Sequence, residues 1–537
     1  MAIDFEQAIK KYPHLRLYLE ALKSKGMRAP RFYDKIPREM SDEQNVNIIY
    51  PTLEDKVFVH ILKDPKQNRY FAIEPKLTDP EKKKYHEILD IILENAPREK
   101  VPERDKELEA TLIKLFNMSV RKSALAITDF GVRKVYVTDE EYEKFIYYVR
   151  RDVIGQSMLQ PILSDPYIED IHEVGARNIR VIHKVFEAVE TDLTFENDQV
   201  LRDFLRNLSE RIGRPVSIAK PIADSVLPDG SRINIIYAED VSLRGSSFTI
   251  RKFSTIPTSI IQLIKFGSVN PQIVAYLWLC LENGMNIFVA GETASGKTTI
   301  LNALLVFVHP DAKILTAEDT PEVRPSQQLW QQLLTRESGP EEGRVDMFII
   351  LKAALRSRPN YIIVGEIRGK EGLVAFQAMQ TGHSVMATFH ASSIRRMIQR
   401  LAGDPINVPL TFMDNLNVAM FLQAVYVKGK YLRRCTAVEE VEGYNEDAGG
   451  VVTRQMFSWD ASTDAHKFGG LNNSYILEDK IAPKAGYLDP RKIYDELDTR
   501  TRIIEIMVEK NILDYFAVMD TIVAFYRGGI NALPFRV

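Results

Sequence analysis

Cysteine is scarce in this sequence: Cys280 and Cys435 are the only two in 537 residues. Two cysteines cannot form a disulfide framework or a zinc site of four thiolates, and this composition fits a reducing compartment. An excess of one charge is also missing, since 70 Lys and Arg nearly balance 73 Asp and Glu and leave a net charge of −3. This balance argues against a globally basic nucleic-acid-binding protein, although it leaves room for a local basic groove.

The sequence also lacks a long apolar run. Its most apolar stretch, residues 273–281, is followed by Glu282 and is far shorter than the roughly 20 residues that cross a bilayer. The first residues, MAIDFE, lack the basic start and the apolar core of a signal peptide. We therefore expect a cytoplasmic protein, and any contact with the inner face of the cell membrane has to come through a partner.

What the chain does have is the composition of an ordinary globular protein, with 45% apolar and 27% charged residues. At roughly 150 residues per domain, its length predicts three or four domains. We expect a helical, charged N-terminal domain over residues 1–135, which three short strand-like runs interrupt. A mixed α/β domain should follow over residues 136–252. The Pro-containing residues 253–259 should link it to a third domain over residues 260–537.

Strands and helices alternate in the last of these domains. Four apolar runs of strand length, residues 286–290, 313–316, 361–364 and 384–389, are separated by helical segments. Near-continuous apolar strands that alternate with helices are typical of a parallel sheet covered on both faces. The sequence therefore predicts an α/β fold in this domain.

A glycine-rich motif follows the first of these strands. GETASGKT at residues 291–298 fits the pattern G-x-x-x-x-G-K-[ST] at every fixed position, between an apolar strand and a helix that begins near Thr299. In such a loop, backbone N–H groups and the helix N-terminus bind phosphate, Lys297 reaches the β- and γ-phosphates of ATP, and the Thr298 hydroxyl binds Mg²⁺. A chance match in a strand-to-helix turn is the alternative, and both correct flanks argue against it. The expected nucleotide-binding residues are Gly291, Glu292, Thr293, Ala294, Ser295, Gly296, Lys297, Thr298 and Thr299.

Glu366 is the candidate for the carboxylate that a P-loop needs to bind the metal or to orient water. It ends the run YIIVGE, one residue later than the usual acidic position. A shift of one residue turns a side chain to the other face of a strand. A turn of the backbone at the strand end would still bring Glu366 to Mg²⁺ or to the attacking water. Otherwise Glu366 is a solvated acid at a strand end.

Two further groups stand beside predicted strands. Glu318, Asp319 and Glu322 follow the second strand, where a parallel sheet places its chemistry, but capping acids of a polar loop would look the same. His383 and His390 bracket the fourth strand. An imidazole near a γ-phosphate can donate a hydrogen bond to it, whereas one buried structural histidine and one exposed histidine are the alternative. No third ligand at a familiar spacing supports metal binding by this pair.

Taken together, these segments resemble the secretion ATPase superfamily, the ring-forming motors of type II and type IV secretion, type IV pili and the archaeal flagellum. Its four nucleotide motifs occur in order: a Walker A motif at residues 291–298, an Asp box at 316–322, a Walker B motif at 362–368 and a His box at 381–390. The similarity extends upstream through LPDGSR and RGSSFTIRKF, and Gly-Glu is the family's normal Walker B form.

The resemblance implies roles for individual residues. It makes Glu366 the Walker B acid and Glu318 the Asp-box acid, and it makes His383 and His390 sensors of the γ-phosphate. Three arginines would bring positive charge to the nucleotide from the N-terminal domain or from a neighbouring subunit, which can raise phosphoryl-transfer rates by several powers of ten. Surface salt bridges are the alternative for each of them. These arginines are Arg232, Arg244 and Arg251.

The resemblance also implies an architecture and partners. It predicts a homo-hexameric ATPase with a helical and PAS-like N-terminal half, a RecA-like C-terminal domain, and bound ATP and Mg²⁺. Within the superfamily the sequence is most similar to the archaellum motor ATPase, because the Cys-x-x-Cys pairs of many bacterial members are missing and a charged N-terminal extension and a long tail are present. An archaeal pilus-assembly ATPase or a type II secretion ATPase is the alternative. The implied partners are a polytopic membrane platform protein and accessory cytoplasmic motor proteins, without nucleic acid.

Two other functions are compatible with a P-loop. A RecA-like motor that moves DNA or RNA would bind it with a steep dependence on salt, but the sequence has no basic–aromatic groove motif. A regulatory subunit that binds ATP without hydrolysing it is the other, and the intact Lys297, Thr298 and Glu366 argue against it.

Overall fold

The computed structural model describes residues 5–37, 40, 43–52, 56–100, 105–122, 133–253, 256–336, 343–427, 430–447 and 449–537. The chain divides into two compact units, residues 1–254 and 255–537, which we call the N-terminal and the C-terminal unit. The division falls inside residues 253–259, the expected linker, of which residues 254 and 255 lie outside the described part.

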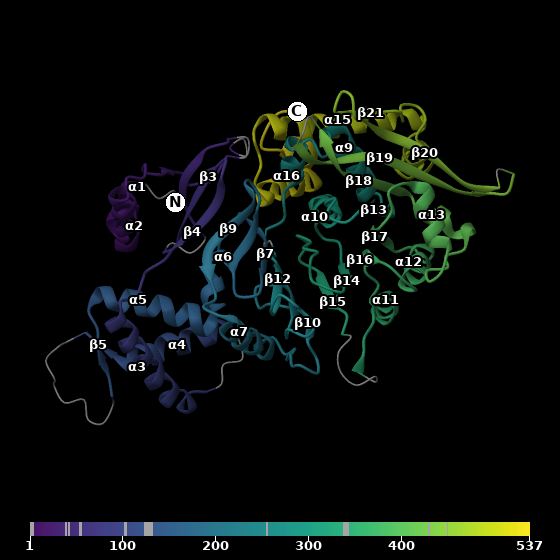
Figure 1. Ribbon diagram of the computed structural model, residues 1–537. Helices are drawn as coiled ribbons and strands as arrows, with labels where there is room; N and C mark the ends of the chain where they lie inside the picture. Colours follow the sequence, from purple (N-terminus) through teal and green to yellow (C-terminus); the bar gives the residue numbers. More distant parts are fainter. Residues whose placement is uncertain are drawn as a thin grey trace. The chain divides into compact units, whose positions relative to one another are not determined.

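A ten-stranded sheet runs through the N-terminal unit, with the strand order β1-β2-β3-β4-β9-β8-β7-β12-β11-β10 (Figure 1). Its strands are β1 (Arg31–Phe32), β2 (Val46–Pro51), β3 (Phe58–Asp64), β4 (Gln67–Ile73), β7 (Ile168–Val174), β8 (Asn178–His183), β9 (Glu187–Thr194), β10 (Ile222–Val226), β11 (Arg232–Ile236) and β12 (Ser247–Arg251). The sheet crosses the boundary expected at residue 135, because β4 pairs in parallel with β9. The expected helical domain is wrong in this respect, since β-branched and aromatic runs place Ile48, Val59 and Tyr70 in the same core as β7–β12.

Three helices of the N-terminal unit pack around a second apolar cluster, which includes Ile88, Phe116 and Phe145. They are α3 (Asp79–Asn95), α4 (Asp105–Ser119) and α5 (Asp139–Val149). The first and last of them begin with capping boxes, headed by Thr78 and Thr138. The unit further contains α1 (Phe5–Lys11), α2 (Pro13–Ser24), α6 (Gln160–Leu163), α7 (Asp198–Arg211) and a small sheet of β5 (Val120–Arg121) and β6 (Val135–Tyr136).

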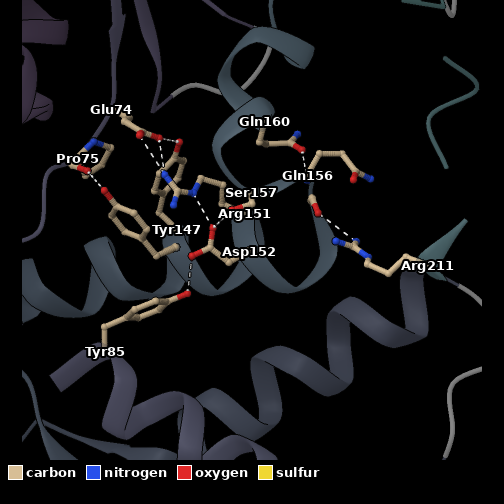
Figure 2. Close-up of polar contacts among 12 residues, drawn as sticks. Glu74, Pro75, Tyr85, Tyr147, Arg151, Asp152, Gln156, Ser157, Gln160 and Arg211 are labelled. Atoms are coloured by element: carbon tan, nitrogen blue, oxygen red, sulfur yellow. Dashed lines mark hydrogen bonds and ion pairs between the residues drawn. The ribbon is translucent and has the colours of Figure 1, made fainter. Parts of the chain in front are cut away.

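A polar network joins this helical layer to the sheet (Figure 2). Arg151 lies in a π-helical turn, η3 (Arg150–Ile154), and its Nη1 donates to both carboxylate oxygens of Glu74, at 3.0 and 3.1 Å. The same guanidinium donates through Nε to Asp152, which also accepts from the Tyr85 hydroxyl of α3. Tyr147 of α5 donates to Glu74. These bonds fix the segment after β4 against α3 and α5.

The sheet of the C-terminal unit has the order β15-β14-β16-β17-β13-β18-β19-β20-β21 (Figure 1). Its strands are β13 (Ile287–Gly291), β14 (Ile314–Glu318), β15 (Trp330–Leu334), β16 (Tyr361–Ile367), β17 (Ser384–Phe389), β18 (Val418–Val427), β19 (Lys430–Asn445), β20 (Gly450–Asp460) and β21 (Ala465–Phe468). All pairings from β15 to β18 are parallel, and those from β18 to β21 are antiparallel. The P-loop strand β13 is thus central, which confirms the predicted α/β, RecA-like P-loop domain with a parallel sheet.

Helices cover both faces of this sheet. Successive residues of β13 therefore pack into two different apolar cores. Ile287 and Val289 pack with helices α9, α10, α15 and α16, whereas Phe288 and Ala290 pack with α11, α12 and α13. None of the helices in the described residues has the length and the apolar composition required to cross a membrane. The helices of the unit are α8 (Ile260–Lys265), α9 (Pro271–Glu282), α10 (Lys297–Leu304), α11 (Met347–Arg356), α12 (Glu371–Gln380), α13 (Ile394–Ala402), α14 (Ala482–Lys484), α15 (Ile493–Glu509) and α16 (Tyr515–Gly528).

Candidate nucleotide-binding site

The phosphate loop lies where a buried strand meets a helix. All residues of β13 are buried, and residues 292–296 lead directly into α10, which begins at Lys297. Gly296 has a φ of 91° just before the helix, in the left-handed region that glycine adopts without strain. Gly291 is required for another reason, since a Cβ atom there would lie 2.4 Å from the carbonyl oxygen of Leu422 in β18. Loop and helix therefore offer the backbone N–H groups that bind phosphate.

Lys297 is half-buried beside this loop. Its Nζ donates hydrogen bonds to the backbone carbonyls of Gly291 and Glu292, at 3.1 and 2.9 Å, and lies 3.5 Å from Nδ1 of His390. Burial is the main cause that lowers the pKa of Lys297 below its ordinary value. The ammonium group is thus held at the loop by carbonyl oxygens that phosphate oxygens can replace.

A bulge in β16 brings Glu366 to the same place. The pairing of β16 with β17 changes register between Val364 and Ile367, so Glu366 does not follow the alternation of the strand before it. Its Oε1 lies 2.8 Å from Nε2 of His390, and its Oε2 accepts a hydrogen bond from Arg368. The register shift is the physical reason why an acid one residue late in the sequence still reaches the phosphate loop.

The charges around Glu366 favour its ionised form. Burial by itself raises the pKa of Glu366, but the hydrogen bond and charge of Arg368, together with His390 and Lys297, outweigh burial and hold that pKa below its ordinary value. Burial, with Lys297, lowers the pKa of His390. Its imidazole is therefore neutral near pH 7, and although its Nε2 is close to Glu366 Oε1, that buried oxygen accepts no hydrogen bond.

Glu318, the last residue of β14, is engaged with its own loop. Its Oε1 accepts hydrogen bonds from the backbone N–H groups of Glu322 and Val323, at 2.7 and 2.6 Å, and its Oε2 accepts one from Gln332 at 3.0 Å. Burial raises the pKa of Glu318. A Cβ atom on Gly365 would lie 3.2 Å from the Glu318 side chain, so β14 and β16 meet closely here. These contacts favour a role in shaping the acidic loop over the catalytic role that the resemblance implied.

The structure does not bring His383 to the phosphate loop. His383 precedes β17 and His390 follows it, and a rise of about 3.3 Å per residue separates the two ends of this strand by roughly 20 Å. His383 instead lines a polar cavity with His309 and Tyr361, at the amino-terminal ends of the parallel strands. The expectation that it senses the γ-phosphate is wrong, because the first and last residues of a strand lie at opposite ends of that strand.

The three arginines expected to act on the nucleotide all lie in the N-terminal unit. Arg232 in β11 and Arg251 in β12 are direct cross-strand partners. The Nε atom of Arg251 lies 3.5 Å from a carboxylate oxygen of Asp170. Arg244 is exposed in the loop before β12. Two of the three thus lie side by side on one sheet, and a role at the nucleotide stays a prediction for all of them.

Thr298 and Glu366 fit the expected magnesium ion by their chemistry. The Thr298 hydroxyl lies in the first turn of α10, and a hydroxyl and a carboxylate are the oxygen ligands that Mg²⁺ prefers. Across the described ranges, no cluster of three or more His, Cys, Asp or Glu side chains could hold a metal ion by itself. Because Mg²⁺ commonly completes its shell with phosphate oxygens and water, these two residues fit an ion that arrives with the nucleotide.

Two arginines at the site received no role from the sequence. Arg368 pairs with Glu366. Side chains two residues apart in an extended segment point to the same side, so this spacing could have indicated the pair. Arg433 of β19 donates from Nε to the backbone carbonyl of Ala294 in the phosphate loop, at 2.9 Å. No local motif marks Arg433, because its position depends on how the hairpin of β18 and β19 folds back along the sheet.

Comparison with known proteins identifies a family whose model matches the chain. Residues 153–420 match the family model described as Type II/IV secretion system protein. The chain is 54% identical to the uncharacterized protein MJ0900 of Methanocaldococcus jannaschii, over 99% of this chain and 98% of that protein. It is 40% identical to the uncharacterized protein MJ1287 of the same organism, over 45% of this chain and 88% of that protein. A crystal structure of the VirB11 ATPase from the Brucella suis type IV secretion system, in complex with sulphate, matches 52% of this chain and 94% of its own length, at 22% identity and a TM-score of 0.27.

Proposed function

The chain belongs to the family of type II/IV secretion ATPases, and we propose that it is a hexameric motor that hydrolyses ATP to drive assembly of the archaellum, and its rotation. The observation that carries the proposal is the convergence of Lys297, Glu366 and His390 at the phosphate loop. Lys297 comes from α10, Glu366 from β16 and His390 from the residue after β17, and a merely structural loop gives no reason for such a meeting.

Hydrolysis at this site is a displacement of ADP by water. The oxygen of a water molecule attacks the γ-phosphorus, the bond from that phosphorus to the β–γ bridging oxygen breaks, and ADP and inorganic phosphate leave. Glu366 orients the water and accepts a hydrogen bond from it, which requires the carboxylate form that Arg368 stabilises. Lys297 moves from the loop carbonyls to the phosphate oxygens.

His390 and the loop backbone stabilise the charge that moves during the reaction. The neutral imidazole can donate from Nε2 to a γ-phosphate oxygen once nucleotide separates it from Glu366. The N–H groups at the start of α10 point at the β-phosphate, where negative charge accumulates as the leaving group forms. Thr298 and Glu366 would hold Mg²⁺, which would neutralise further negative charge on the phosphates.

A ring would complete the site and connect it to its task. In the proposal, Arg232, Arg244 or Arg251 brings positive charge to the nucleotide from the N-terminal unit or from a neighbouring copy. We place the motor in the cytoplasm, at the inner face of the membrane, through a polytopic platform protein and accessory motor proteins. The 54% identity to an archaeal protein across nearly the whole length supports an archaeal system. An archaeal pilus-assembly or type II secretion ATPase is the second candidate.

The experiment that tests the proposal is ATP turnover per chain, measured at rising protein concentration with and without DNA. A self-assembling ring with sites shared between copies predicts turnover that rises with concentration and ignores DNA. A flat rate that DNA stimulates would indicate a nucleic-acid motor instead. ATP binding without turnover at any concentration would indicate a regulatory subunit.

The filament served needs a second experiment, in cells. Deletion of the gene should abolish archaella and swimming while pili remain visible by electron microscopy. Loss of pili with intact archaella would select the pilus-assembly alternative.

A further inference from the structure

The hairpin of β18 and β19 forms a wall beside the phosphate loop. β18 pairs with the P-loop strand β13, with Leu422 opposite Gly291, and then continues past the end of β13. Its partner β19 sends the Arg433 guanidinium to the carbonyl of Ala294, at 2.9 Å. The hairpin therefore contacts the loop directly, on the side of β13 away from β17.

Two exposed tyrosines lie further along this hairpin, on the face that touches the loop. Tyr426 is opposite Tyr431, and Ala424 is opposite Arg433. Because side chains two residues apart share a face of a strand, Tyr431 projects on the same side as Arg433 and Tyr426 on the same side as Ala424. The two rings lie 5.2 Å apart, about 7 Å of strand beyond the arginine.

The opposite face of the hairpin is anchored in the core. Arg434, which alternates with Arg433, is 5% exposed and donates to both oxygens of Asp464, at 2.7 and 2.8 Å. It also donates to the carbonyl of Phe266. The face that carries the tyrosines is consequently held in place from behind, although Tyr426 is 77% and Tyr431 50% exposed. No other tyrosine in the described ranges is as exposed as Tyr426.

The order of the strands sets the direction in which a nucleotide would lie. Glu366 lies in β16 and His390 directly follows β17, so the γ-phosphate end belongs on that side of the loop. The triphosphate crosses the loop, and the base has to emerge on the other side, where β18 and β19 stand. Exposed aromatic rings in that position are a surface on which a nucleobase stacks.

We propose that Tyr426 and Tyr431 form the platform for the adenine base of the bound nucleotide, with Arg433 fixing the loop to that platform. The inference rests on the proposed function, because it assumes that the phosphate loop binds ATP or ADP. It assigns base recognition to a segment outside the four nucleotide motifs, and it predicts that the tyrosine rings act through stacking and not through their hydroxyl groups.

The test is the affinity for ADP and for inorganic pyrophosphate, both with Mg²⁺, measured by isothermal titration calorimetry on the full chain. In the double variant Tyr426→Ala/Tyr431→Ala, loss of stacking should weaken ADP binding roughly 5- to 150-fold. Pyrophosphate has no base, so its affinity should stay within about twofold of wild type, well below the effect of one stacked ring. Tyr426→Phe/Tyr431→Phe keeps both rings and should bind ADP as the wild type does. Tyr444→Ala, an exposed tyrosine at the far end of β19, is the matched control and should also bind normally.

Three results would overturn the proposal in different ways. Unchanged ADP affinity of the double alanine variant would exclude a base platform, and a loss of oligomers in that variant would then identify the ring pair as a contact between copies. An equal loss of ADP and pyrophosphate affinity would show that the substitution disturbs the phosphate loop itself. A wild-type chain that binds neither ligand would refute the proposed nucleotide function together with the platform.

Discussion

The ion pair between Arg368 and Glu366 should determine where ATPase activity is lost at acid pH. The guanidinium is one of the groups that hold the pKa of Glu366 below its ordinary value, against the effect of burial. Replacing Arg368 by alanine removes both the hydrogen bond and the positive charge, so that pKa should rise. Because the reaction needs the carboxylate, activity is lost as pH falls through this pKa. The acid limb of the pH profile should therefore move to higher pH in Arg368→Ala.

The structure limits the size of the shift. The Arg368 side chain is 65% exposed and that of Glu366 is 18% exposed, so water screens the pair in part. Exposed ion pairs contribute about 0.2–1 kcal/mol, and 1.36 kcal/mol corresponds to one pH unit, which gives a shift of roughly 0.1–0.7 of a pH unit. Arg368→Lys retains a positive charge and should shift the limb by less.

The assay is kcat/KM for ATP between about pH 4 and pH 8, since the acid limb of kcat/KM reports the free enzyme, in which this ion pair exists. Arg356→Ala, which removes an exposed arginine at the end of α11, is the control and should leave the limb in place. An acid limb in Arg368→Ala that stays fixed, or moves to lower pH, would refute the account of how Glu366 is kept ionised.

Other substitutions test separate parts of the structure. Arg151→Met removes the partner of the Glu74 carboxylate, an arginine whose side chain is only 13% exposed. This change should lower the free energy of unfolding by about 3 kcal/mol, seen as a drop of roughly 6–12 °C in the first calorimetric transition. An unchanged transition would contradict the network of Figure 2. His390→Gln should lower kcat about 10²-fold or more. His383→Gln should leave kcat unchanged, because His383 lies at the other end of β17. Equal losses in the two variants would contradict that separation. Gly291→Ala places a Cβ atom 2.4 Å from a carbonyl oxygen of β18 and should reduce the yield of folded protein and its melting temperature, so wild-type stability would contradict the close approach of the two strands.

Local sequence signals were sufficient for the parts of the site that a short segment builds. The buried strand, the loop and the helix from residue 287 to residue 304 are contiguous, and Lys297 follows from their pattern alone. Glu366 was identified as a candidate, but its orientation comes from a bulge between β16 and β17. A bulge depends on the partner strand, so the sequence of β16 by itself could not supply it.

Contacts between distant segments account for what the sequence did not predict. Glu318 is acidic and follows a strand, as expected, but its carboxylate is used by the N–H groups of Glu322 and Val323. The strands β2 to β4 join the sheet through the pairing of β4 with β9, more than a hundred residues away. Arg433 reaches the phosphate loop across 139 positions of the chain. Each of these depends on tertiary pairing, which local propensity does not determine.

The most direct test of the central claim is phosphate release from Mg-ATP by the purified chain and by its Lys297→Ala variant, at a protein concentration where the wild type turns over. Lys297 is half-buried at the loop and would contact the β- and γ-phosphates. We expect sustained release by the wild type and none above background by Lys297→Ala, with the same circular dichroism spectrum for both. Equal release by the two proteins would place hydrolysis elsewhere and contradict the assignment of this site.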